Sequence, residues 1–465
     1  MSITGKDLIG WGLKPGKWFS EALASGNRAL AEGQDMTSVQ ALVTAMAPPE
    51  IRKIPLQSGV PVHMAIEAET PDEEANVASV TESMEALMRT PTIRGGAVMP
   101  DACPVGPKGT IPVGGVAAAE GAIHPGMHSA DICCSVAISI LGDVDPKAVL
   151  DAAQRVTHFG GGARREDARV PLPAGLGERF VANPFLLPAK DVAAQHFATQ
   201  GDGNHFLFVG RLRSTGEVAL VTHHGSRKPG AILYKRGKEV AEKLRRLQSP
   251  ETLKQNAWIP FDTEDGRAYW DALQVIRDWT KANHFAIHDL TQEAVAARAR
   301  ERFWNEHNFV FRRGKMFLHG KGATPAWGDY AEDASGLVLI PLNMAEPVLI
   351  ARGTDKAEAL GFCPHGAGRN YSRSEHMRRM GAETPAERLA RETEGIDARF
   401  FSGVPDASEL PSAYKPAATV VRQIEQFGLA EVVDYVDPYG CIMAGDWLKP
   451  FRERRRAKRR VSAAS

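Results

Sequence analysis

Cysteine is scarce in this sequence. Five cysteines occur among 465 residues, and no two of them have the C-x-x-C spacing of a redox or zinc motif. An odd number of cysteines in a chain of this length does not suggest a disulfide framework, which is typical of small secreted domains. The sequence therefore favours a reducing compartment, and we expect a cytoplasmic protein.

Long apolar runs and an excess of one charge are also missing. The longest apolar stretch, residues 337–350, is interrupted by two prolines, an asparagine and a glutamate, and residues 1–6 lack the pattern of a signal peptide. We therefore expect neither a membrane span nor a membrane partner. The basic and acidic residues balance at 56 each, so any contact with nucleic acid must come from a local basic patch.

The composition, 43% hydrophobic and 24% charged, is that of a globular protein with a large core. Helix-like and strand-like segments are mixed along the chain, which indicates the α/β (α+β) class. We predict a short helical extension over residues 1–55, a single large domain over residues 56–447 and a basic tail over residues 448–465. The tail is either a solubilising extension or a salt-dependent contact for a phosphate backbone.

One histidine lies in a glycine-rich loop. Pro364 restricts the backbone before His365, so a helix is not expected to run through this histidine. Gly366 and Gly368 would allow the backbone to approach a bulky anion, and Arg369 offers a forked donor. A neutral imidazole in such a loop can bind a metal, transfer a proton or attack phosphorus. Taken alone, the loop is more typical of a histidine that only hydrogen-bonds a neighbouring carbonyl, and the rest of the chain decides otherwise.

One carboxylate, one thiol and three imidazoles occur beside glycines or at the ends of strand-like segments. They are Asp131, Cys134, His205, His223 and His307. A thiolate can bridge two divalent ions, and the other groups would complete two open coordination spheres suited to phosphoryl chemistry. Ligand chemistry alone favours zinc or another borderline metal. Each of these residues taken by itself could be structural.

Two further histidines, His284 and His288, have i, i+4 spacing within a helical segment over residues 270–300. This spacing can chelate a metal, but the segment lacks the glutamate of the H-E-x-x-H motif. We therefore expect a packed or solvated helix face. Lys321 lies in a Gly-Lys-Gly-Ala-Thr segment that could hold phosphate, although its spacing differs from that of a P-loop.

Seven blocks of sequence follow one another between about residue 61 and about residue 445. They are V-M-P-D at residues 98–101, D-I-C-C at 131–134, G-N-H-F at 203–206, H-H-G-S-R at 223–227, H-N-F at 307–309, K-G-A-T at 321–324 and H-G-A-G-R at 365–369. In this order the blocks resemble those of the RtcB-type RNA ligases. That family joins RNA ends that bear a 3′-phosphate and a 5′-hydroxyl.

The resemblance implies an α/β fold around a central site with two Mn²⁺ ions. In the family pattern, Asp131, Cys134, His205, His223 and His307 fall on the metal ligands, and Cys134 bridges the two ions. Manganese is implied by the resemblance alone, because the ligand chemistry does not exclude zinc.

The resemblance also implies a covalent mechanism. His365 would attack the α-phosphate of GTP, or of another nucleoside triphosphate, with Asp101 beside the site. The nucleotide then passes from the histidine to an RNA 3′-phosphate, and the 5′-hydroxyl attacks that activated end. The implied partners are tRNA or damaged RNA, and the family also suggests an archease-like activator.

Further residues fall on family positions that hold the nucleotide or the RNA. The nucleotide positions are Asn204, Asn343, Met344, His365, Gly366, Ala367, Gly368, Arg369 and Tyr414, the last of which matches the residue that stacks on the base. The RNA-phosphate positions are Arg227, Lys321 and Arg373.

Five positions depart from the family pattern. Cys103 stands in place of a histidine, and Ser135 stands in place of the glycine after the bridging cysteine. Among the residues that read guanine, Phe208 replaces a glutamate, Val348 a serine and Ala444 a lysine. A carboxylate and an ammonium can pair with guanine, whereas these replacements offer neither charge nor side-chain donor. We therefore predict a weakened preference for GTP over ATP.

Three other functions are compatible with parts of this pattern. A dinuclear metal phosphoesterase would need the metal ligands but not His365. An RNA 3′-end nucleotidyltransferase would stop before the ligation step. A non-catalytic RNA-binding relative would fit the altered base positions and the basic tail, but it would have no use for the metal ligands and His365.

Overall fold

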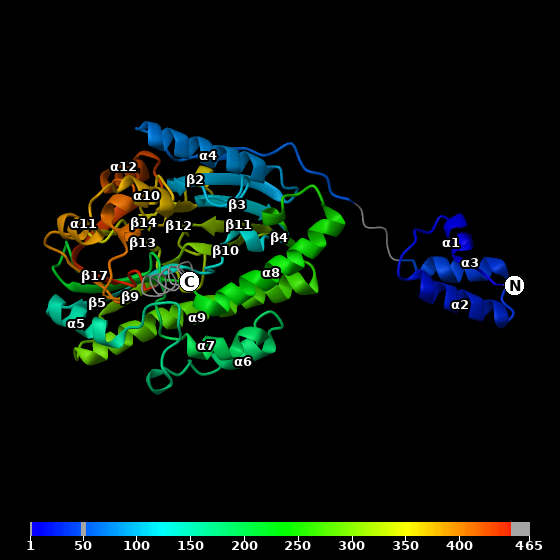
Figure 1. Ribbon diagram of the computed structural model, residues 1–465, viewed down its shortest axis with the longest axis horizontal. Coiled ribbons are helices and arrows are strands. Elements are labelled where there is room, and N and C mark those ends of the chain that lie inside the picture. The colour runs from blue at the N-terminus through cyan, green and yellow to red at the C-terminus, as the bar shows by residue number, and fades with distance from the viewer. Residues whose placement is uncertain (1, 48–52, 448–465) are drawn as a thin grey trace, which may run out of the picture. The chain divides into compact units, whose positions relative to one another are not determined.

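The computed structural model describes residues 2–47 and 53–447 (Figure 1). Contacts within the chain define two units, Met1–Ile54 and Pro55–Ser465. The predicted basic tail over residues 448–465 lies outside the described residues. Within the described part of the chain, no helix is both long enough and apolar enough to cross a bilayer.

The smaller unit is helical. The carboxylate of Asp35 accepts a hydrogen bond from the backbone N–H of Ser38 and caps the third helix. Leu8, Val39 and Val43 are fully buried and belong to a small core of their own. The helices are α1 (Gly5–Gly10), α2 (Phe19–Ala31) and α3 (Met36–Ala45).

The larger unit contains an eight-stranded sheet, with strands in the order β13, β14, β17, β6, β7, β5 and β9, and with β16 paired to β17. The bounds are β5 (Ser135–Gly142), β6 (Phe206–Leu212), β7 (Val218–His224), β9 (Glu301–Glu306), β13 (Leu337–Pro341), β14 (Val348–Gly353), β16 (Asp397–Phe400) and β17 (Ala430–Met443).

A second, five-stranded sheet has the order β1, β2, β3, β11 and β10. Two short strand pairs, β4 with β8 and β12 with β15, complete the β structure of the described residues. The bounds are β1 (Val62–Met64), β2 (Ile93–Cys103), β3 (Val113–Glu120), β4 (Ala122–Ile123), β8 (Ile259–Pro260), β10 (Asn308–Arg313), β11 (Met316–Lys321), β12 (Ala323–Pro325) and β15 (Phe362–Pro364). Mixed helix and sheet within one large unit confirm the predicted α/β (α+β) class.

Helices pack on both sheets. α4 packs on β2, α9 packs on β5 and β7, and α8 and α9 lie side by side (Figure 1). The bounds are α4 (Pro71–Met88), α5 (Pro146–Val156), α6 (Leu176–Ala182), α7 (Lys190–Gln195), α8 (Arg227–Gln248), α9 (Glu264–Ala294), α10 (Arg373–Arg379), α11 (Pro385–Glu392) and α12 (Ala417–Gln426).

The long helix α9 covers strands that are buried along their whole length. Every residue of β5 and β7 is buried, which requires cover on both faces of the sheet. Trp279 of α9 is fully buried, and its indole N–H donates to the carbonyl of Ala193 at 3.1 Å. The helix begins before the predicted residue 270, because the Thr263 hydroxyl accepts a hydrogen bond from the Gly266 N–H and caps it there.

The strand order brings together residues that are far apart in the sequence. β6, β7, β5 and β9 are consecutive neighbours and pair antiparallel, so the start of one strand lies beside the end of the next. Cys134 and His205 directly precede β5 and β6, whereas His223 lies at the end of β7 and His307 follows β9. These four side chains therefore emerge at the same edge of the sheet.

Candidate metal centre and active site

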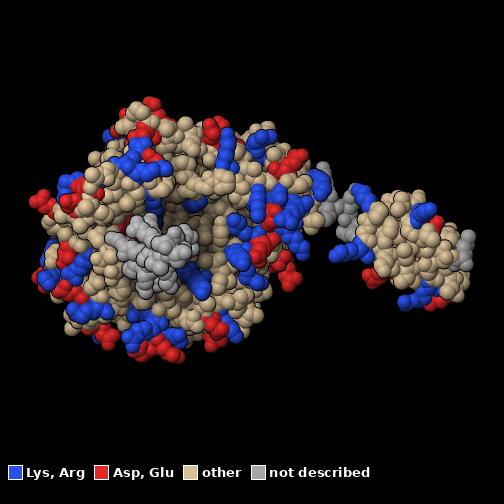
Figure 2. Space-filling model, viewed as in Figure 1, with Lys and Arg blue, Asp and Glu red and all other residues tan. Residues whose placement is uncertain are grey.

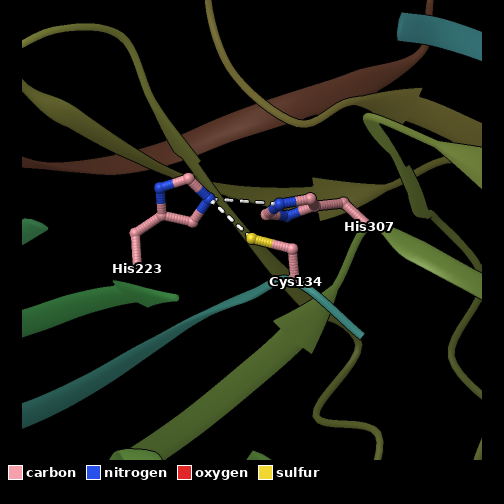
Figure 3. Close-up of side chains that lie close together, drawn as sticks. All are labelled: Cys134, His223 and His307. Carbon is pink, nitrogen blue, oxygen red and sulfur yellow. Dashed lines mark hydrogen bonds between the residues drawn. The ribbon is translucent and has the colours of Figure 1, made fainter. Parts of the chain in front are cut away.

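Three of the predicted ligands form one compact group. The Cys134 Sγ lies 3.2 Å from the His223 Nε2, and the same His223 nitrogen lies 3.2 Å from the Nε2 of His307 (Figure 3). All three side chains are buried. Their donor atoms lie close enough together to hold one metal ion.

A second group shares the same cysteine. The Cys134 Sγ lies 3.7 Å from the His205 Nε2, which lies 2.9 Å from the Oδ2 of Asp131. The donor atoms of Asp131, Cys134 and His205 all lie within 4.8 Å of one another, as do those of the first group. One sulfur thus belongs to two adjacent sets of donors, which is the arrangement that a bridging thiolate would need.

The outer nitrogens of two histidines are fixed by backbone carbonyls. The His205 Nδ1 lies 2.7 Å from the Gln200 carbonyl oxygen, and the His223 Nδ1 lies 3.1 Å from that of Asn204. A carbonyl oxygen can only accept, so both Nδ1 atoms carry the proton and both Nε2 atoms present lone pairs to the cluster. This is the usual way in which a metal-binding histidine is oriented.

Burial disfavours the charged forms of the cysteine and of two histidines in the cluster. Desolvation lowers the pKa of His223 to about 3 and that of His307 well below its ordinary value. Burial also raises the pKa of the Cys134 thiol well above its usual value, and the carboxylate of Asp131 adds to this effect. A thiolate at this position therefore requires a positive charge, and a divalent ion would supply it. The residues present fit a metal centre.

Two features of the backbone shape the metal site. At Gly225, a Cβ atom would lie 2.2 Å from an oxygen of Asp131, so only glycine leaves room for this carboxylate. At Cys133 the backbone has a φ of 58°, which turns adjacent cysteines in different directions. Cys133 packs in the main hydrophobic core, whereas Cys134 joins the cluster.

His365 lies beside this cluster but is bound differently. Its Nδ1 lies 2.5 Å from the Oδ2 of Asp101, and its backbone N–H donates to the same oxygen at 3.2 Å. Asp101 is fully buried, and the ring centroids of His365 and His307 are 4.7 Å apart. Within the described residues, His365 belongs to neither group of potential metal ligands. The carboxylate holds the proton on Nδ1 and leaves the Nε2 lone pair available for chemistry.

The model of the tRNA-splicing ligase RtcB family matches residues 174–444. The chain belongs to the RtcB family. It is 28% identical over 410 residues to the tRNA-splicing ligase RtcB of Archaeoglobus fulgidus, covering 71% of this chain and 84% of that one. It is 26% identical over 405 residues to the RNA-splicing ligase RtcB of Mycobacterium bovis, covering 71% and 93%. It is also 27% identical over 293 residues to the tRNA-splicing ligase RtcB of Pyrococcus furiosus, where it spans only 30% of that relative.

A cavity of about 630 Å³ in this RtcB-family chain adjoins the cluster. Most of the predicted site residues line it. They are Asp131, Cys134, Asn204, His223, His307, Lys321, Asn343, Met344, His365, Gly366, Ala367, Gly368, Arg369, Arg373 and Tyr414. Asp101, His205 and Arg227 do not line the cavity. Asp101 and His205 contact side chains that do, whereas Arg227 donates to the Gly160 carbonyl at 3.0 Å and lies near Asp131.

Two arginines in the cavity wall share one carboxylate. An oxygen of Glu409 lies 2.6 Å from a guanidinium nitrogen of Arg369, and its other oxygen lies 2.5 Å from one of Arg373. The Tyr414 hydroxyl donates to Glu409 at 2.6 Å, and the Arg369 guanidinium lies 4.5 Å from the centroid of the Tyr414 ring. Glu409 is 1% exposed. It therefore fixes the directions of these three side chains at the cavity wall.

Sequence reasoning did not single out Glu409 or Lys415. The buried Lys415 ammonium donates to the carbonyls of Pro100 and Ala102, at 2.8 and 3.0 Å, and so holds the backbone on both sides of Asp101. Neither residue stands next to a histidine or a glycine-rich block. The only signal for them in the sequence was their closeness to Tyr414, which directly precedes Lys415 and follows shortly after Glu409.

Lys321 points toward the cavity from the end of β11. Its ammonium donates to the Ile111 carbonyl at 3.1 Å. Burial lowers its pKa to about 8, with Cys103 opposing and Lys238 adding to the shift. A cation of this kind gains stability when an anion enters the cavity.

Two of the three residues expected at base-reading positions line the cavity. Phe208 and Val348 lie in its wall with Met344, Cys441 and Met443, and all five are buried in one hydrophobic cluster. Ala444 is buried but does not line the cavity. This part of the wall, as the structure describes it, is apolar.

Replacement of Cys134 tests the shared-sulfur arrangement. We expect Cys134→Ala to remove both metal ions together, because each group of donors loses its sulfur. The measurement is metal content per chain after dialysis, by elemental analysis. Cys133→Ala is the matched control and should retain the metal with a modest loss of stability, since Cys133 is a small core residue. If Cys133→Ala lost the metal and Cys134→Ala kept it, the assignment would be reversed.

Proposed function

We propose that this protein is an RNA ligase that joins a 3′-phosphate, or a 2′,3′-cyclic phosphate, to a 5′-hydroxyl through a histidine–nucleotide intermediate. The observation that carries the proposal is the contact between Asp101 and His365 at the edge of the cysteine-sharing cluster. A metal-dependent hydrolase would need the cluster, but it would have no use for a fourth histidine held by a buried carboxylate. Membership of the RtcB family supports the same reaction class.

The first step would form a covalent bond between the Nε2 of His365 and the α-phosphorus of a nucleoside triphosphate. The bond from that phosphorus to the pyrophosphate oxygen breaks, and pyrophosphate leaves. The imidazole becomes positively charged as its lone pair is used, and the carboxylate of Asp101 at Nδ1 stabilises that charge.

In the next steps the RNA replaces the histidine. An oxygen of the RNA 3′-phosphate attacks the same phosphorus, and the bond to Nε2 breaks. The 5′-hydroxyl then attacks the activated 3′-phosphate, loses its proton and expels the nucleoside monophosphate. Lys321 and Arg373 line the cavity and are suited to hold the phosphates during these exchanges. Arg227 lies outside the cavity lining but near Asp131, and we propose that it adds positive charge there.

The metal centre would be held by Asp131, Cys134 and His205 on one side and by Cys134, His223 and His307 on the other. Two divalent ions bound there would neutralise charge on the phosphate oxygens. We infer manganese from the family resemblance, whereas the sulfur and imidazole donors suit zinc as well.

RNA is the proposed partner of this cavity. On the face of the larger unit shown in Figure 2, Lys and Arg side chains gather around a hollow in the surface. Such a distribution gives a local positive field although the formal net charge of the whole chain is zero. A cytoplasmic location and an archease-like activator are further expectations, the first from the five free cysteines and the second from the family.

Removal of the His365 imidazole tests the covalent step. We expect His365→Ala to abolish acid-labile labelling of the protein by α-³²P nucleotide in the presence of Mn²⁺. Metal content should stay at the wild-type value, because His365 lies outside both donor groups. Labelling that persisted in His365→Ala, or metal lost with the side chain, would contradict this role. A wild-type protein that never labels but hydrolyses phosphoesters would favour the phosphoesterase instead.

The apolar cavity wall leads to a prediction about the base. Each lost polar contact to guanine weakens discrimination by about 1–3 kcal/mol. With Phe208, Val348 and Ala444 in the three positions, we expect the ratio of GTP to ATP labelling to be about tenfold or less. Parallel labelling time courses with each α-³²P nucleotide give the ratio. The variant Phe208→Glu, which places a carboxylate in the cavity wall, should shift it toward GTP. Strong GTP selectivity in the unmodified protein would show that other residues read the base.

A further inference from the structure

A polar face of α9 is buried against the back of the metal-bearing strands. Asn283, His284 and His288 are all 0% exposed, although polar side chains usually avoid complete burial. The structure thus confirms that His284 and His288 belong to a packed helix face.

Alternation along the strands links this face to the metal ligands. Successive side chains of a strand point to opposite faces of the sheet. His223 points to the cluster, so Thr222 and His224 of the same strand point to α9. Ser135 follows Cys134 in the same way and is paired with His224 across the strands. Each of these ligands therefore has a neighbour that faces the helix.

A continuous chain of hydrogen bonds joins those neighbours to the two helix histidines. The His284 Nε2 lies 2.9 Å from the Ser135 hydroxyl, and its Nδ1 lies 2.7 Å from that of Thr222. The His288 Nε2 lies 2.8 Å from the Thr222 hydroxyl, and its Nδ1 lies 2.7 Å from that of Ser139. Every ring nitrogen of the two histidines has a hydroxyl partner, so neither ring has a free lone pair for a metal.

One assignment of the protons gives every hydrogen bond in this network a donor and an acceptor. Ser139 donates to His288, His288 donates to Thr222, Thr222 donates to His284, and His284 donates to Ser135. The Ser135 hydroxyl then donates to the Cys133 carbonyl, 3.0 Å away. Both imidazoles are neutral in this scheme, and all the donors are used.

The same helix also supports a third ligand. The side-chain amide of Asn283 donates to the Thr199 carbonyl at 2.9 Å, and its oxygen accepts from the Thr199 N–H at 3.2 Å. The next residue, Gln200, provides the carbonyl that orients His205. In addition, the His284 ring stacks on that of His224, with centroids 3.5 Å apart.

We propose that His284, His288 and Asn283 are positioning residues that hold three ligand-bearing segments in one rigid arrangement. The inference rests on the metal centre of the proposed function. Thr222 is the junction of the network, because its hydroxyl serves both histidines and its neighbour is His223. Without this hydroxyl, the end of β7 would lose its hydrogen bonds to the two histidines of α9, and the His223 Nε2 would be held less firmly in the cluster.

The test uses Co²⁺ as a spectroscopic probe of the full-length, metal-depleted protein. Thiolate-to-cobalt and ligand-field absorption bands report the geometry and occupancy of the site directly. We expect Thr222→Val, which keeps the side-chain shape, to weaken Co²⁺ binding by about tenfold or more and to alter the band pattern. Thr222→Ser retains the hydroxyl and should restore both.

Thr291→Val is the matched control. Thr291 is fully buried on the same helix, but its hydroxyl donates to the Ile287 carbonyl of α9 itself. This variant should bind Co²⁺ like the wild type even if its melting temperature falls. If Thr222→Val bound Co²⁺ with the same affinity and spectrum as Thr291→Val and the wild type, the positioning role alone would be overturned. A wild-type protein that binds no Co²⁺ would overturn both this role and the metal centre.

Discussion

The structure depends on the gathering of five metal-type donors at one edge of a sheet, with Asp131 half-buried and the other four buried. A thiol, a carboxylate and three imidazoles are packed within a few ångströms, and burial disfavours their charged forms except where partners compensate. Burying such a set of donors costs free energy of folding, and the binding of a cation would offset that cost. The antiparallel strands β6, β7, β5 and β9 supply the rigid edge that this arrangement requires.

The partners of the histidines separate their roles. His205 and His223 place Nδ1 against neutral backbone carbonyls, which fix the ring but add no charge. His365 places Nδ1 against the carboxylate of Asp101. A full negative charge stabilises an imidazole that becomes positive during attack on phosphorus, whereas a carbonyl is sufficient for a ring that only donates a lone pair to a metal. In the function that we propose, one fold would therefore use the same side chain in two ways.

Specific residues show where sequence reasoning was sufficient and where it was not. The glycine-flanked His365 loop and the D-I-C-C block have local signatures, and the structure places both at one cavity. Glu409 has no such signature, because its importance comes from two arginines and a tyrosine that converge on it in space. The i, i+4 spacing of His284 and His288 indicated a helix face, but spacing alone could not reveal the hydroxyl groups that face them.

The sequence by itself determined the family, the mixed class of fold and many of the residues that line the cavity, because those depend on ordered local blocks. Only the tertiary structure decided which donors share Cys134, that Asp101 binds His365, and that Phe208 and Val348 lie in the cavity wall while Ala444 does not. These facts depend on strand order and register. Register is set by pairing between segments far apart in the chain, and a shift of one residue would turn each side chain to the opposite face.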